Sequence, residues 1–115
     1  MNDNRIEIIR ALVELTYPLD MIASRIREFD WDYEGDPVEL TRSHVINLLK
    51  RYLKKEFAVC DVEHWANLLE GREDVCFESG SESVLDEIIY QLANPDLTVA
   101  LNDDIANTLI GDLSK

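Results

Sequence analysis

The sequence predicts an all-α fold: a single domain over residues 1–115, with about six helices packed as an irregular bundle. Apolar side chains recur at three- and four-residue steps through most of the chain, which is the spacing of amphipathic helices. Residues typical of helix ends, such as Pro18, Thr41 and Asn102, separate these stretches. The chain of 115 residues, 46% of them hydrophobic, is long enough to bury one core without disulfides.

Residues 3–16 form the first predicted helix, which is apolar on nearly all sides and should therefore be packed by several neighbours. Pro18 ends it, because proline disfavours a helical conformation at Tyr17, and suits the first turn of the next helix. The second helix continues with apolar residues at helical spacing to Phe29. Almost no linker joins the two helices, so we expect a hairpin or a steep crossing.

A third helix is predicted from an N-cap at Thr41 to about Phe57. It is the only basic helix, and most of its bases come late, where the helix dipole favours cations. We therefore expect it to contact acidic neighbours within the fold. Its bases are Arg42, Lys50, Arg51, Lys54 and Lys55.

The stretch 60–75 predicts a short fourth helix that ends at Gly71, since glycine adopts the left-handed conformation of a helix C-terminus without penalty. Trp65 lies centrally on its apolar side, and we expect it to fill the core. Residues 72–74 should then leave as a charged loop, with 75–77 turned inward.

The fifth helix should start near Ser81 or Ser83 and stop at Pro95, and Asn102 should cap the sixth. Three short apolar segments could adopt extended backbone, but each is too short to predict a sheet. They are 38–40, 75–77 and 98–101.

Net charge is the strongest compositional feature. Twenty-four acids against eleven bases give −13, distributed as −2 over residues 1–60 and −11 over residues 61–115. Such a field repels nucleic acid and anionic membranes, so we expect neither as a partner. It attracts a basic protein and speeds its capture. The alternative is that the acids serve only solubility.

No targeting, metal or catalytic motif is recognisable. The N-terminus carries acid where a signal peptide needs base, and no apolar run approaches the ~18 residues of a membrane span, so we expect a cytoplasmic protein. Cys60 and Cys76 should be thiols there, and with His44 and His64 they lack the spacing of compact zinc sites. No phosphate loop, nucleophile elbow or zinc protease motif occurs. We expect no metal, no cofactor and no enzymatic activity.

The segment 30–36 is the first candidate partner-binding surface, because its large aromatic residues are of the kind that interfaces favour. Its carboxylates could bind Lys and Arg of a partner, or occupy a basic groove in place of phosphates. It also resembles the start of a calcium-binding EF-hand loop, but Thr41 stands where a bidentate glutamate is needed. The alternative is that the aromatics turn inward and the acids only meet solvent. The proposed contact residues are Asp30, Trp31, Asp32, Tyr33, Glu34 and Asp36.

The second candidate surface is formed by Glu70, Glu73 and Asp74, beside the end of the fourth helix. These acids belong to a larger cluster that flanks one loop and two helix ends. The alternative is an ordinary solvated face. The other members are Glu78, Glu82, Asp86 and Glu87.

Two blocks carry a family resemblance: residues 40–53, LTRSHVINLLKRYL, and residues 62–75, VEHWANLLEGREDV. They resemble all-helical immunity proteins of bacterial contact-dependent growth inhibition and related polymorphic toxin systems. The resemblance spans roughly residues 37–95, and WANLLEGRED is its most specific part. It departs at residues 58–60, where a polar helix cap would be expected.

The resemblance implies a role and no catalytic residues. An immunity protein of this kind binds one cognate toxin domain in the cytoplasm and blocks its active site. Many such toxins are basic nucleases, which agrees with the charge of this chain. The rival expectation is a non-enzymatic regulatory or adaptor protein that binds a basic host protein.

Overall fold

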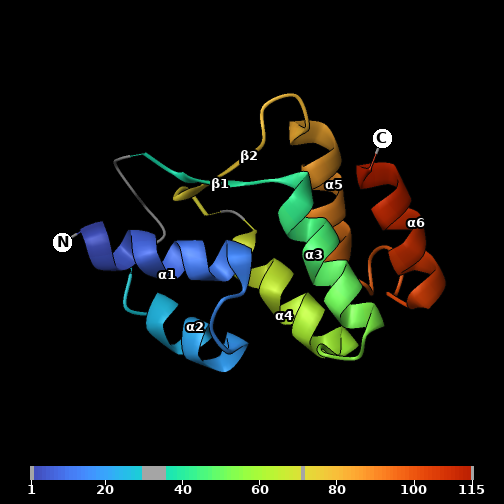
Figure 1. Cartoon of the computed structure of the whole chain (residues 1–115), viewed down its shortest axis with the longest axis horizontal. Coiled ribbons are helices and arrows are strands. Elements are labelled where there is room, and N and C mark those ends of the chain that lie inside the picture. The colour runs from blue at the N-terminus through green and yellow to red at the C-terminus, as the bar shows by residue number, and fades with distance from the viewer. Residues whose placement is uncertain (1, 30–35, 71, 115) are drawn as a thin grey trace.

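The computed structural model of the chain describes residues 2–29, 36–70 and 72–114 (Figure 1). It confirms the predicted all-α domain of about six helices and adds two short strands. The helices are α1 (Asn2–Glu14), α2 (Leu19–Ile26), α3 (Arg42–Leu53), α4 (Val59–Leu69), α5 (Glu82–Ala93) and α6 (Asp103–Leu113), and the strands are β1 (Val38–Leu40) and β2 (Val75–Phe77).

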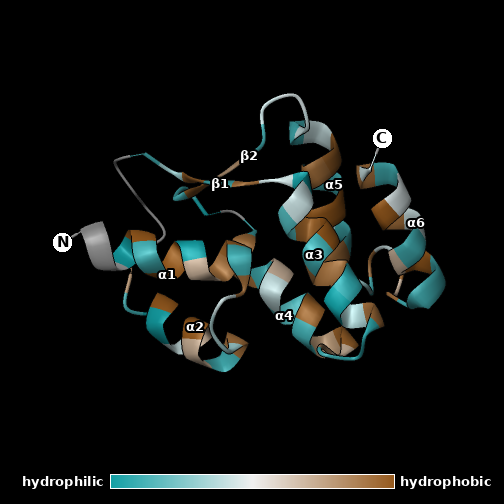
Figure 2. Ribbon diagram, in the orientation of Figure 1, coloured by the Kyte–Doolittle hydropathy of each residue, from teal (hydrophilic) through white to brown (hydrophobic). Residues whose placement is uncertain are grey.

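The helices pack mainly in pairs, α1 with α2, α3 with α6 and α4 with α5. In Figure 2 hydrophobic and hydrophilic residues alternate along each helix, as expected for helices with one buried side. Trp65 is fully buried, and its indole N–H donates a 2.7 Å hydrogen bond to the carbonyl oxygen of Leu12, which ties α4 to α1. The prediction that Trp65 fills the core is therefore confirmed.

The two strands form a parallel two-stranded sheet that lies beside α1 (Figure 1). Val38 is in register with Val75 and Leu40 with Phe77. Two of the three short apolar segments that could adopt extended backbone do so, whereas residues 98–101 remain irregular. The pairing of the two strands into a sheet was not predicted. Three residues are too few to show alternation, and parallel pairing joins segments far apart in sequence, so neither strand has a local signature.

Helix α3 ends at Leu53, four residues before the predicted end. Lys55 has a φ of +70°, its N–H donates to the Tyr52 carbonyl, and the Glu56 N–H donates to the Arg51 carbonyl, both at 2.9 Å. This is a Schellman ending, which requires a left-handed residue at the position that Lys55 occupies. Leu15, directly after α1, also has a left-handed φ, of +53°.

The predicted caps at Thr41 and Asn102 are confirmed. Thr41 Oγ1 accepts the His44 N–H at 3.2 Å, and His44 Nδ1 accepts the Thr41 N–H at 2.9 Å, so histidine takes the place that glutamate usually has in a capping box. At α4, where no polar cap precedes the helix, the Asp61 carboxylate accepts the Ala58 N–H at 2.9 Å.

Candidate partner-binding surfaces

Most of the first predicted surface lies outside the described residues: Asp30, Trp31, Asp32, Tyr33 and Glu34. Asp36 is described and exposed. It borders a hollow of about 430 Å³ between α1, β1 and the start of α3, which Glu14, Glu39 and His44 also line. Arg10 lines it too, so the end of the predicted surface meets charged groups of both signs from other elements.

His44 in this hollow is a capping residue. Burial lowers its pKa, against the opposing effect of the Glu14, Glu39 and Glu78 carboxylates. Its Nδ1 accepts the Thr41 N–H, and only an unprotonated nitrogen can accept a hydrogen bond. The neutral imidazole thus holds the first turn of α3.

The second predicted surface is divided by the structure. Glu73 is exposed, and Glu70 is half-buried with its carboxylate accepting from the Asn94 side chain at 3.3 Å. Asp74 is only 1% exposed, and Arg72 only 8%. The expectation that residues 72–74 form a charged surface loop is therefore corrected: Asp74 does not lie on a partner-binding surface.

Asp74 is buried because two arginines satisfy its carboxylate. The Nε and a terminal nitrogen of Arg72 donate to its two oxygens at 2.8 and 3.0 Å, and Arg5 Nε donates at 2.9 Å from α1. Burial alone would raise the pKa of Asp74, but the hydrogen bonds and charges of Arg72 and Arg5 outweigh it and hold the pKa below its usual value. This ion network joins α1 to the segment before β2.

The larger acidic cluster is also divided. The Glu78 carboxylate accepts the backbone N–H of Arg42 at 2.9 Å, and the Arg42 Nε lies 3.5 Å from the same carboxylate oxygen. For Arg42, the expectation that the bases of α3 contact acidic neighbours is therefore confirmed. Glu82 accepts the Gly80 N–H at 2.9 Å, while Asp86 and Glu87 are exposed on α5. Some acids of the cluster therefore serve the fold and others face solvent.

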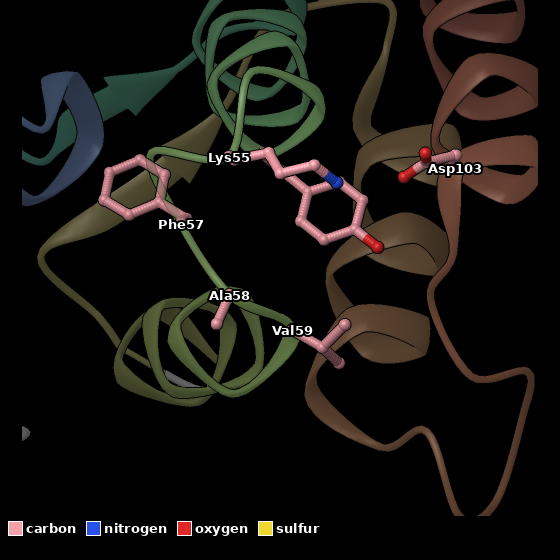
Figure 3. A pocket seen from close by; sticks show the side chains of 6 residues that line it. Lys55, Phe57, Ala58, Val59 and Asp103 are labelled. Carbon is pink, nitrogen blue, oxygen red and sulfur yellow. The ribbon is translucent and has the colours of Figure 1, made fainter.

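A surface absent from the sequence predictions lies around Val59 at the start of α4, which borders a hollow with Asp103 of α6 and a crevice with Val99 of the segment between α5 and α6. We call it the α4–α6 corner. Val59 is 39% exposed, Leu97 73% and Val99 50%, all high for apolar side chains. The hollow that Val59 lines has a volume of about 330 Å³ (Figure 3). Its lining residues are Tyr52, Lys55, Phe57, Ala58, Val59 and Asp103.

Val59 connects two parts of this corner, because it also lines a narrow crevice with Pro95 and Val99. In Figure 3 the Asp103 carboxylate extends from α6 on the far side of the hollow from Phe57. Burial and the Asp103 charge raise the pKa of Tyr52, so its phenol stays protonated. The only sequence sign of the corner was the apolar run at 98–101, which lies outside any helical pattern.

A second exposed apolar pair, Tyr17 at 42% and Met21 at 38%, lies between α1 and α2. It borders a hollow of about 170 Å³ together with Glu7 and Arg25. Its charged neighbours are thus of both signs.

No group of three or more His, Cys, Asp or Glu side chains in the described part of the chain is placed to hold a metal ion. Cys60 is exposed and Cys76 half-buried, and neither forms a disulfide. Burial and, after it, the Glu39 charge raise the pKa of Cys76, which favours the thiol. No helix within the described residues has the length and apolar character to cross a membrane.

Comparison of the chain with protein-family models, with curated proteins and with solved structures gave no match.

Proposed function

We propose that the protein is an immunity protein: a non-enzymatic inhibitor that binds one basic toxin domain, of the nuclease class, and occludes its active site. One observation carries the proposal. Arg72 is the only Lys or Arg among the described residues from 61 to 114, and it is buried against Asp74. The outer surface of this part of the chain therefore presents carboxylates unopposed by bases of its own.

Such a surface suits a nuclease as target. A nuclease active site is built to bind phosphates, so its surroundings are rich in Lys and Arg. Carboxylates held by a folded partner pair with the same groups, and their field accelerates the encounter. The resemblance of residues 40–53 and 62–75 to helical immunity proteins supports the same role.

Co-expression tests this proposal. The tagged protein is produced with the polypeptide encoded directly upstream of it, and the pair is examined by pull-down and by growth. We expect a 1:1 complex and rescue of growth. Absence of both would refute the immunity role and leave the regulatory or adaptor reading, in which the partner is a basic host protein encoded elsewhere.

The first predicted surface is tested in the same complex by reversing Asp32, Glu34 and Asp36 to Lys. If this surface contacts the toxin, association slows by about tenfold or more at low salt, because steering by charge acts on the on-rate. Reversal of three exposed acids elsewhere, Asp20 on α2 with Asp86 and Glu87 on α5, is the control with the same change in net charge. Equal effects of both variants would show general attraction and no contact at the segment 30–36.

A further inference from the structure

We infer that the α4–α6 corner is the contact surface for the basic partner, and that the partner inserts an apolar side chain, flanked by Lys or Arg, into the hollow between Tyr52 and Val59. This inference rests on the proposed function and specifies where the partner binds and what chemistry it presents. It differs from both surfaces that the sequence suggested.

The first support is the apolar surface that the corner leaves uncovered. Leu97 and Val99 are half or more exposed in the segment between α5 and α6, whereas most leucines and valines of the chain are buried or half-buried. Val99 shares a narrow crevice with Val59, and Val59 also lines a hollow of about 330 Å³ whose walls include the Tyr52 and Phe57 rings (Figure 3). Rings beside an open hollow suit the capture of a partner side chain, which is how interface anchors bind.

The second support is the charge around this apolar surface. Asp103 lines the hollow and Glu63 lines the crevice. Asp96, next to Leu97 in the chain, and Asp104, next to Asp103, are exposed. Lys55 is the one base among the residues that line the hollow, and the Arg51 guanidinium lies 4.6 Å from the centre of the Phe57 ring. The rim of this apolar surface thus carries four acids against two bases, and this excess of acid is complementary to an apolar side chain that is flanked by bases.

The same charges disfavour the other occupants of an apolar surface. A second copy of this chain would bring its own acidic rim against this one, and like charges in contact oppose association. Nucleic acid and anionic lipid are repelled for the same reason. The corner therefore fits a basic protein segment.

The binding chemistry can be tested without the natural partner. The probe is a synthetic amphipathic helix of leucine and lysine, and the control peptide has the same length and charge with serine in place of each leucine. Each is titrated into the labelled protein while backbone amide resonances are followed by NMR. We expect the leucine peptide to bind at least about tenfold more tightly and to shift the amides of Val59, Leu97, Val99 and Asp103.

Two results would overturn the inference. One is equal affinity for the two peptides, which would show attraction by charge alone. The other is a set of shifts centred on Tyr17 and Met21, which would place the apolar contact between α1 and α2.

The complex with the upstream polypeptide gives the second test. Leu97→Ser with Val99→Ser should weaken that complex by about tenfold or more, as expected for loss of apolar anchors. Tyr17→Ser with Met21→Ser is the control, since it removes similarly exposed apolar surface elsewhere, and should leave affinity unchanged. Thermal melts establish that both variants are folded.

The outcomes separate the two proposals. A complex that Leu97→Ser with Val99→Ser leaves unchanged upholds the immunity role and overturns the corner. Peptide binding at the corner without any complex with the upstream polypeptide upholds the corner as a docking surface for basic segments and refutes the immunity role.

Discussion

Two regions of this acidic chain use charge in opposite ways. Around Asp74 a carboxylate is sealed between Arg5 and Arg72, with hydrogen bonds of 2.8 to 3.0 Å to both. At the α4–α6 corner the carboxylates of Asp103 and Asp104 remain at the surface, beside apolar side chains that are 39% to 73% exposed. One region is closed and the other is open.

The difference shows that the role of a carboxylate depends on which base the fold brings to it. Glu73 and Asp74 are adjacent in sequence, yet one is exposed and the other buried. Arg5 comes from α1, 69 residues away, and no local pattern announces it. We therefore expect changes in the closed region to affect folding and changes in the open region to affect binding.

The largest effect is expected for Asp74→Ala. It leaves two guanidinium groups without their shared carboxylate, and loss of one partner from a buried ion pair costs about 3–5 kcal/mol in the free energy of unfolding. Urea unfolding followed by circular dichroism measures it. The adjacent Glu73→Gln should cost at most about 1 kcal/mol, because exposed charges contribute little. Similar losses in both variants would remove the contrast between the regions.

Glycine substitutions at the two left-handed residues sharpen the same contrast. Leu15→Gly relieves the backbone but removes a leucine that is only 6% exposed, so we expect a net loss of about 2 kcal/mol or more. Lys55→Gly relieves a similar backbone at an exposed side chain, so we expect a gain of up to about 1 kcal/mol. Thermal melts of both variants show whether each substitution raises or lowers stability. A lower stability of Lys55→Gly would show that the Lys55 side chain also stabilises the fold.

Acid should weaken the closed region. The pKa of Asp74 is lower in the folded protein than its ordinary value of 3.8, so its contribution to stability is complete above that pH and is lost as the pH falls below it. The difference in unfolding free energy between wild type and Asp74→Asn should therefore narrow below pH 3.8, by at most about 1.4 kcal/mol per pH unit. A difference that stays constant from about pH 5 to pH 3 would contradict this assignment.

The smallest effect on folding is expected at the open region. Leu97→Ser removes a side chain that is 73% exposed, so the unfolding free energy should change by less than about 0.5 kcal/mol. Urea unfolding of this variant is directly comparable with that of Asp74→Ala. A loss above 1 kcal/mol would mean that Leu97 packs as part of the fold, and the corner would no longer count as open.

Local patterns predicted the helices, because the spacing of apolar residues and the caps at Thr41 and Asn102 lie within a few residues of one another. The same approach failed where the deciding partner is remote. The pairing of β1 with β2 and the burial of Asp74 both depend on segments far away in the chain. The early end of α3 was missed because lysine, at position 55, is not a residue that announces a left-handed turn.

The candidate surfaces could be predicted only in part. Charge composition indicated where acids are dense, which the exposed acids of α5 and α6 reflect. It could not tell Asp74 from Glu73, since both have the same chemistry and the same neighbours in sequence. Nor could it find Leu97 and Val99, because an apolar residue outside a helical pattern is ordinarily expected to be buried.

The ties from α1 to the middle of the chain have a consequence for synthesis. The first helix leaves the ribosome early, but the indole that bonds to Leu12 and the carboxylate that bonds to Arg5 belong to Trp65 and Asp74. At about 5–20 residues per second, several seconds pass before these groups emerge. During that interval α2, which follows α1 directly in the chain, is already available to pack on it, whereas the parts of α1 that contact Trp65 and Asp74 lack their native cover until residue 74 is free to fold.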